Sequence, residues 1–98
     1  MIKYIKENEF EKEIEEGKVL VDFFATWCGP CKMLGFVLEK FESKVDLPIL
    51  KVDVAENDVL ASEYKIFSVP TLILFENGKE IKRISGFMSE EELESWVK

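Results

Sequence analysis

Residues 19–31 of this 98-residue chain read VLVDFFATWCGPC, a run of strand-forming residues followed at once by the only two cysteines, Cys28 and Cys31. Side chains at positions i and i+3 of a helix are neighbours, roughly 5–6 Å apart between their Cβ atoms. If a helix begins at residue 28, the two thiols lie close enough to form and break a disulfide with little movement. The stretch therefore predicts a buried strand, a turn and a helix that carries a redox-active pair.

A structural role explains the cysteine pair less well. A disulfide stabilises mainly by closing a long loop of the unfolded chain, whereas this one would enclose only Gly29 and Pro30. As a metal site the pair supplies two soft ligands where zinc normally takes four, and the chain has no histidine and no third cysteine. We therefore expect no metal within one chain. A zinc ion or cluster that bridges two chains stays open, since two such pairs supply four thiolates.

Length and composition describe one globular domain that spans residues 1–98. Hydrophobic residues make up 47% and charged residues 34%, and a chain of this length buries enough surface to fold without metal. The net charge of −7 has the wrong sign for a nucleic-acid or anionic-membrane binder. Residues 1–9 lack the apolar run of a signal peptide, and no later run could span a membrane. We expect a cytoplasmic monomer, and a reducing cytosol favours a catalytic pair.

Strand and helix patterns alternate along the chain. Residues 19–25 are apolar on both faces except at Asp22, which is typical of a central strand covered on both sides. The motif Asn77-Gly78 predicts a hairpin, and Ser89 with Glu92 predicts a helix start. Strands are expected at residues 2–5, 19–25, 48–54, 71–76 and 79–84, and helices from a cap at Asn8 to Gly17, after Cys28, at residues 58–65 and after Ser89. The order βαβαβαββα predicts an α/β fold, a central mixed five-stranded sheet with helices on both faces.

A helix start at Cys28 separates the roles of the two thiols. Backbone N–H groups and the positive end of the helix dipole would stabilise a Cys28 thiolate, which lowers the pKa of this thiol and makes it the attacking group. Cys31, one turn into the helix and shielded from water, would stay protonated until it resolves a mixed disulfide. Without a histidine to stabilise the thiolate further, the reduced pair is a better reductant than oxidant.

Other parts of the chain extend the pattern around the cysteines. An aspartate precedes the first cysteine by six residues, Lys32 follows the second, Val69-Pro70-Thr71 precedes a strand, and Gly86 precedes the last helix. Together with the Trp-Cys-Gly-Pro-Cys motif and the element order, these features resemble the thioredoxin family over nearly the whole chain. The resemblance implies a protein-disulfide reductase of the thioredoxin fold, with no cofactor beyond the redox-active Cys28–Cys31 disulfide, recharged by a thioredoxin reductase and acting on disulfide-containing proteins.

The resemblance also implies roles for individual residues. Asp22 matches a buried aspartate that helps to move the proton of the second cysteine, and Lys51 matches a lysine near it. Pro70 matches a proline whose preceding peptide bond is cis and which packs against the cysteines. The substrate-binding residues implied are Trp27, Gly29, Pro30, Val69, Pro70 and Gly86, with Ile66, Phe67 and Phe87 as further candidates for an apolar rim.

The chain departs from the family pattern at two positions. Phe24 stands where the family usually has tryptophan, and Phe36 stands where it usually has a proline that kinks the active-site helix. These changes are expected to tune substrate fit or redox potential. The alternatives are oxidase or isomerase activity on the same chemistry, a glutaredoxin-like role, a dedicated redox partner of one client, and a binding or chaperone module with an idle cysteine pair.

Overall fold

The computed structural model describes residues 2–98, and all its strands belong to one five-stranded sheet of order β1-β3-β2-β4-β5. The neighbours β1, β3 and β2 run parallel, whereas β4 runs antiparallel to both β2 and β5. The sheet is therefore mixed, as the sequence predicts. The strands are β1 (Ile2–Tyr4), β2 (Lys18–Phe24), β3 (Ile49–Asp53), β4 (Thr71–Glu76) and β5 (Lys79–Ser85).

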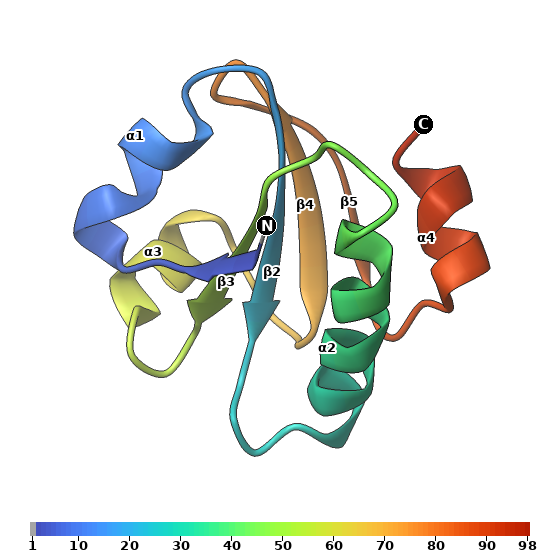
Figure 1. Cartoon of the computed structure of the whole chain (residues 1–98). Helices are drawn as coiled ribbons and strands as arrows, with labels where there is room; N and C mark the ends of the chain where they lie inside the picture. The colour runs from blue at the N-terminus through green and yellow to red at the C-terminus, as the bar shows by residue number, and fades with distance from the viewer. Residues whose placement is uncertain (1) are drawn as a thin grey trace.

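Helices cover both faces of this sheet (Figure 1). On one side lie α1 (Phe10–Ile14) and α3 (Asp58–Glu63), and on the other lie α2 (Gly29–Glu42) and α4 (Glu90–Trp96). Side chains from each pair of helices pack in a separate apolar cluster with opposite faces of the sheet. The predicted α/β architecture with two helical layers is confirmed.

The alternation of side chains along β2 determines which residues of this strand pack against each of the two helical layers. Val19, Val21 and Phe23 pack in the cluster with α1 and α3, while Leu20 packs in the cluster with α2 and α4. Because successive residues of a strand point to opposite faces, Asp22 lies on the same face as Leu20. The one carboxylate of this strand is thus directed into the layer that contains α2.

Local signals placed most of the element ends correctly. Asn77 and Gly78 form the turn between β4 and β5 with positive φ values of 51° and 83°, the backbone that a two-residue hairpin turn requires. The Ser89 side chain accepts a hydrogen bond from the Glu92 N–H at 3.2 Å and starts α4. The predicted helix at 58–65 ends two residues early, and Lys65 beyond it has a φ of 55°.

The expected helix start at Asn8 is wrong. Asn8 lies inside a short 3₁₀ helix, η1 (Glu7–Glu9), that precedes α1. The Glu7 N–H donates to the Asn57 side chain at 2.9 Å, and the Lys6 N–H donates to the Glu9 carboxylate at 2.9 Å. A contact with a residue fifty positions away therefore helps to begin this turn earlier, and no local pattern contains it.

Candidate functional site

The cysteine pair lies where β2 leads into α2. Cys28 has an extended backbone and stands as the N-cap of the helix, and its Sγ accepts a hydrogen bond from the Cys31 N–H at 3.2 Å. Gly29 and Pro30 occupy the first turn, where the missing N–H of a proline leaves no helical hydrogen bond unmade. The two cysteines form a disulfide with their Cα atoms 5.2 Å apart. The predicted helix start and pairing are both confirmed.

The two cysteines differ slightly in their burial. Cys28 is 7% exposed and Cys31 is 2% exposed, and both pack with Phe24 and Ala25 in a small apolar cluster. Trp27, immediately before the pair, is largely exposed. Cys28 is therefore the less buried residue of the pair, which is the order that the two roles require.

A second segment, the loop before β4, packs against the pair. The Val69–Pro70 peptide bond is cis, as the family resemblance implies, and the Val69 carbonyl oxygen lies 3.7 Å from the Cys28 Sγ. The Pro70 carbonyl accepts a hydrogen bond from the Gly86 N–H at 2.9 Å. Three stretches that are far apart in the sequence thus meet at one place. They contain five of the six residues implied to bind substrate, and the sixth, Trp27, directly precedes Cys28.

The predicted aspartate and lysine form a buried pair. Asp22 is fully buried on β2, and Lys51 is its register partner on the parallel strand β3, with the Lys51 Nζ 3.6 Å from an Asp22 carboxylate oxygen. Neither carboxylate oxygen of Asp22 has a hydrogen-bond partner among the described residues. Burial raises the Asp22 pKa from 3.8 to about 6, although the Lys51 charge acts in the opposite direction. The carboxyl group can therefore exchange a proton near neutral pH.

Lys51 also contacts aromatic rings that the sequence analysis did not connect with it. Its Nζ lies 4.7 Å from the ring centre of Phe24 and 5.5 Å from that of Tyr4, both within cation–π range. A Cβ added to Gly35 of α2 would lie 3.4 Å from the same Nζ, so the ammonium group nearly touches the helix backbone. The only advance signal for this arrangement is the family resemblance, which implies a lysine at position 51 near Asp22.

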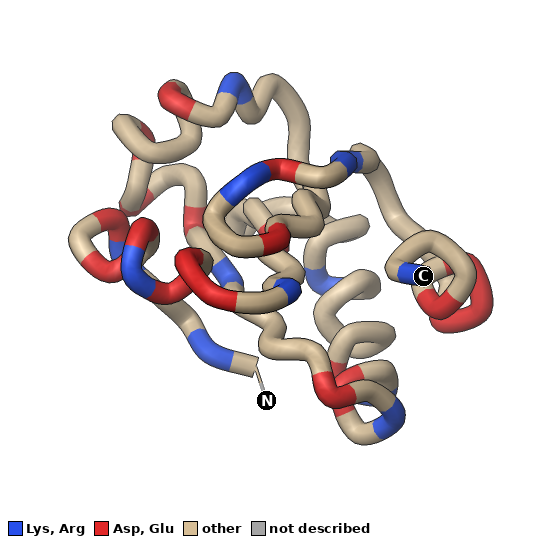
Figure 2. Tube along the Cα trace, turned by 90° about the horizontal axis from the view of Figure 1, so that it is seen from above, with Lys and Arg blue, Asp and Glu red and all other residues tan. Residues whose placement is uncertain are grey.

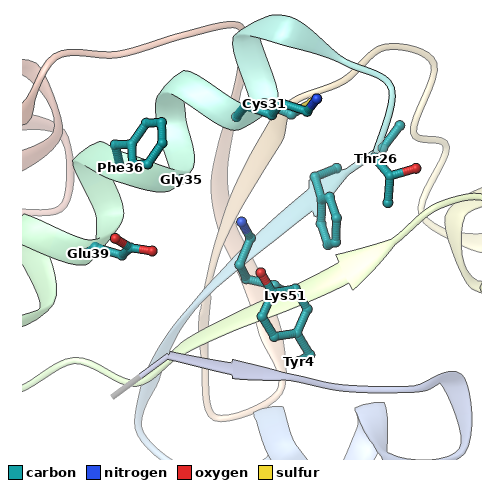
Figure 3. Close-up of a pocket in the computed structure, with 10 residues that line it drawn as sticks. Tyr4, Thr26, Cys31, Gly35, Phe36, Glu39 and Lys51 are labelled. Carbon is teal, nitrogen blue, oxygen red and sulfur yellow. The ribbon is translucent and has the colours of Figure 1, made fainter.

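A cavity of about 420 Å³ connects the lysine with the second cysteine. Lys51, Cys31 and Gly35 line it, and Phe36 and Tyr4 stand at its sides (Figure 3). Lys51 rises from β3 toward α2 in this view. Cys31 and Lys51, the ion-pair partner of Asp22, therefore line one cavity, which is roomy enough for water.

Only some of the residues expected to form an apolar rim around the cysteines are exposed on the surface. Phe67 is 90% exposed and Phe87 is also exposed, whereas Ile66 is half-buried and packs against the core cluster of α1 and α3. Ile66 is thus held largely by core packing. Among residues 2–98, no three His, Cys, Asp or Glu side chains are grouped so that they could hold a metal ion. No helix in the same range has the length and apolar character needed to cross a membrane.

Comparisons with known proteins agree with this geometry. The thioredoxin family model matches residues 1–98. Thioredoxins from Staphylococcus epidermidis and Staphylococcus aureus are each 45% identical over 93 residues, covering 91% of this chain and 88% of theirs. A mutant thioredoxin from Halobacterium salinarum NRC-1 has a solved structure that matches with a TM-score of 0.90 at 37% identity, covering 98% of this chain and 87% of that one.

Proposed function

This chain belongs to the thioredoxin family, and we propose that Cys28 is the attacking thiol and Cys31 the resolving thiol of its protein-disulfide reductase activity. The protein is a thiol–disulfide oxidoreductase, so it has disulfide substrates and is recharged by a reductase. The observation that carries the proposal is the position of Cys28 at the start of α2, where its sulfur faces the Cys31 N–H and the residue is less buried than Cys31.

In the first step, the Cys28 thiolate attacks one sulfur of a substrate disulfide. The Cys31 N–H and the positive end of the α2 dipole face the Cys28 sulfur and stabilise its thiolate, the form that attacks. A mixed disulfide forms and the first substrate sulfur leaves as a thiolate that takes up a proton. The Val69 backbone, beside the Cys28 sulfur, is the site for an extended substrate segment, flanked by Trp27 and Gly86.

In the second step, Cys31 attacks the Cys28 sulfur and releases the second substrate thiol. Cys31 must first lose its proton, and we assign the acceptor as Asp22, reached through the cavity that Cys31 shares with Lys51. A carboxyl group with a pKa of about 6 is mostly ionised at neutral pH and can take that proton. In total, one substrate disulfide becomes two thiols while the dithiol of the protein becomes the disulfide.

The electron donor, location and partners are also part of this proposal. We infer that the electron donor is a thioredoxin reductase, and that the protein works as a cytoplasmic monomer with no nucleic-acid or membrane partner. The Cys28–Cys31 disulfide is the only redox group that the chemistry needs, so no further cofactor is proposed. The net charge of −7 supports the exclusion of polyanionic partners.

The test is the reduction of insulin disulfides by dithiothreitol, followed with the wild type, Cys28→Ser and Cys31→Ser. We expect the wild type to accelerate the reaction, Cys28→Ser to be inactive, and Cys31→Ser to accumulate as a mixed disulfide with the substrate. Equal rates for the wild type and Cys28→Ser would contradict the assignment and favour a binding module with an idle pair. A trapped adduct on Cys31 in the Cys28→Ser variant would instead reverse the two roles.

A further inference from the structure

Beside the dithiol, α2 presents apolar side chains that the core does not use. The core-facing stripe of this helix consists of Leu34, Leu38 and Phe41, all fully buried. By contrast, Met33 and Phe36 of the same helix are exposed, Phe36 to 64%. Because they are three residues apart, they lie on the same side of the helix. Large apolar groups exposed together on a small soluble protein mark contact surfaces more often than chance.

These side chains border a hollow with a defined shape. Met33, Phe36 and Val37 of α2 face Phe87, which lies in the segment leading into α4, and together they line a groove of about 300 Å³. This volume suits one large side chain of a partner, because it is about ten times the volume of a water molecule. Hereafter this hollow is called the α2–α4 groove.

The α2–α4 groove continues the surface around the reactive sulfur. Phe87 directly follows Gly86, whose N–H is bonded to the Pro70 carbonyl beside the cysteines. Met33 follows Pro30 by three residues in α2, and hence lies on the same side of the helix as this residue of the active-site motif. A protein that places its disulfide at Cys28 therefore has this groove within reach along the same face.

The end of the groove at α4 carries more acidic than basic side chains. Glu90 lines the groove and opens an acidic first turn of α4 with Glu91 and Glu92. Glu90 is ion-paired with Lys44, and the Glu92 carboxylate accepts a hydrogen bond from the Ser89 N–H at 2.9 Å. Figure 2 shows the red coil of α4 next to the C-terminus. On the α2 side Lys40 lines the groove. The net charge of −7 adds a field that attracts positive partners.

We propose that the α2–α4 groove binds an apolar side chain of the disulfide-bearing protein partner, one that carries a lysine or arginine next to it on the α4 side. The inference rests on the proposed reductase function and adds a specificity determinant to it. Phe36 is the centre of this contact, because it borders both this groove and the cavity at Lys51. The groove selects among partners and takes no part in the exchange of sulfur bonds.

The test compares second-order rate constants for the reduction of synthetic peptide disulfides by the reduced protein, with acid quenching and chromatography of the peptide thiol. Each peptide is a dimer joined by one disulfide, and its arm carries phenylalanine with lysine, phenylalanine with glutamate, or serine with lysine at several spacings from the cysteine. Glutathione disulfide serves as a substrate that is too small to reach the groove. The proteins are the wild type, Phe36→Gln, Met33→Gln and, as a matched control, Val59→Gln, which changes a 63% exposed side chain on α3.

We expect the wild type to prefer the phenylalanine–lysine arm over the serine–lysine arm by about tenfold, which corresponds to about 1.4 kcal/mol. Phe36→Gln and Met33→Gln should reduce this preference, while Val59→Gln keeps it. Met33→Gln and Val59→Gln should reduce glutathione disulfide at the rate of the wild type. Equal rates with all arms would overturn the groove while leaving the reductase function intact. Equal rates with the lysine and glutamate arms would overturn the basic partner. A wild type that reduces no disulfide would refute the proposed function itself.

Discussion

Substitution of the buried aspartate, Asp22→Asn, should stabilise the oxidised protein in a manner that depends on pH. A carboxyl whose pKa rises from 3.8 to about 6 on folding costs the native state about 3 kcal/mol once it is ionised. Asparagine has nearly the same shape and cannot ionise, so it avoids that cost. The variant is therefore expected to be more stable than the wild type and to lack the proton acceptor assigned to Asp22.

The sign follows from the direction of the shift. Because the folded-state pKa lies above the unfolded value, the native state binds the proton more tightly, and this contribution to stability is fully present below about pH 4. It is lost as the pH rises through about 6. The difference in unfolding free energy between Asp22→Asn and the wild type should therefore grow from near zero at about pH 4 to about 3 kcal/mol at about pH 7.

Guanidinium chloride denaturation of both oxidised proteins at several pH values measures this difference directly. Asp46→Asn is a suitable control, since Asp46 is exposed and its substitution should change the unfolding free energy little. An Asp22→Asn advantage that is the same at every pH would refute the ionisation argument. A variant less stable than the wild type at neutral pH would show that the Lys51 ion pair outweighs the cost of burial.

Three further substitutions test the surroundings of the site. Lys51→Met should raise the Asp22 pKa above about 6, because the Lys51 charge lowers it in the wild type. The pH–rate profile of insulin reduction should then move to higher pH. An unchanged profile would contradict the electrostatic coupling between Lys51 and Asp22. Gly35→Ala should raise the melting temperature by about 4–8 °C, because alanine favours a helix over glycine by about 1 kcal/mol and its Cβ would lie at contact distance, 3.4 Å, from the Lys51 Nζ. A lower melting temperature would mean that this contact with the buried, ion-paired ammonium is repulsive. Ser89→Ala should lower the unfolding free energy by about 1 kcal/mol through loss of the α4 cap, read from the denaturation midpoint at an unchanged m-value, and no shift would show the cap to be dispensable.

Features encoded by short stretches could be predicted from the sequence. The apolar run of β2, the Asn77-Gly78 turn and the Ser89 cap each depend on residues within a few positions, and each appears in the structure where expected. The position of Cys28 at the helix start is of the same kind, because the proline that follows suits the first turn of a helix.

Features that depend on distant contacts could not be predicted in this way. The early turn before α1 involves the Asn57 side chain, and the surroundings of Lys51 come from β1, β2 and α2 together. Only the parallel register of the strands places Tyr4 and Asp22 on either side of Lys51. The family resemblance supplied the pairing of Asp22 with Lys51 and the cis peptide bond, which local patterns do not contain.

The Asp22–Lys51 pair also constrains how β2 and β3 can assemble during folding. In parallel strands a slip by one residue turns a side chain to the opposite face of the sheet. Such a slip would place Asp22 opposite Leu50 or Val52 and leave both charges buried without each other. Apolar residues on these two strands accept many neighbours, but a buried carboxylate and a buried ammonium tolerate only each other. The same two residues that are assigned to proton transfer thus penalise every misaligned pairing of the central strands.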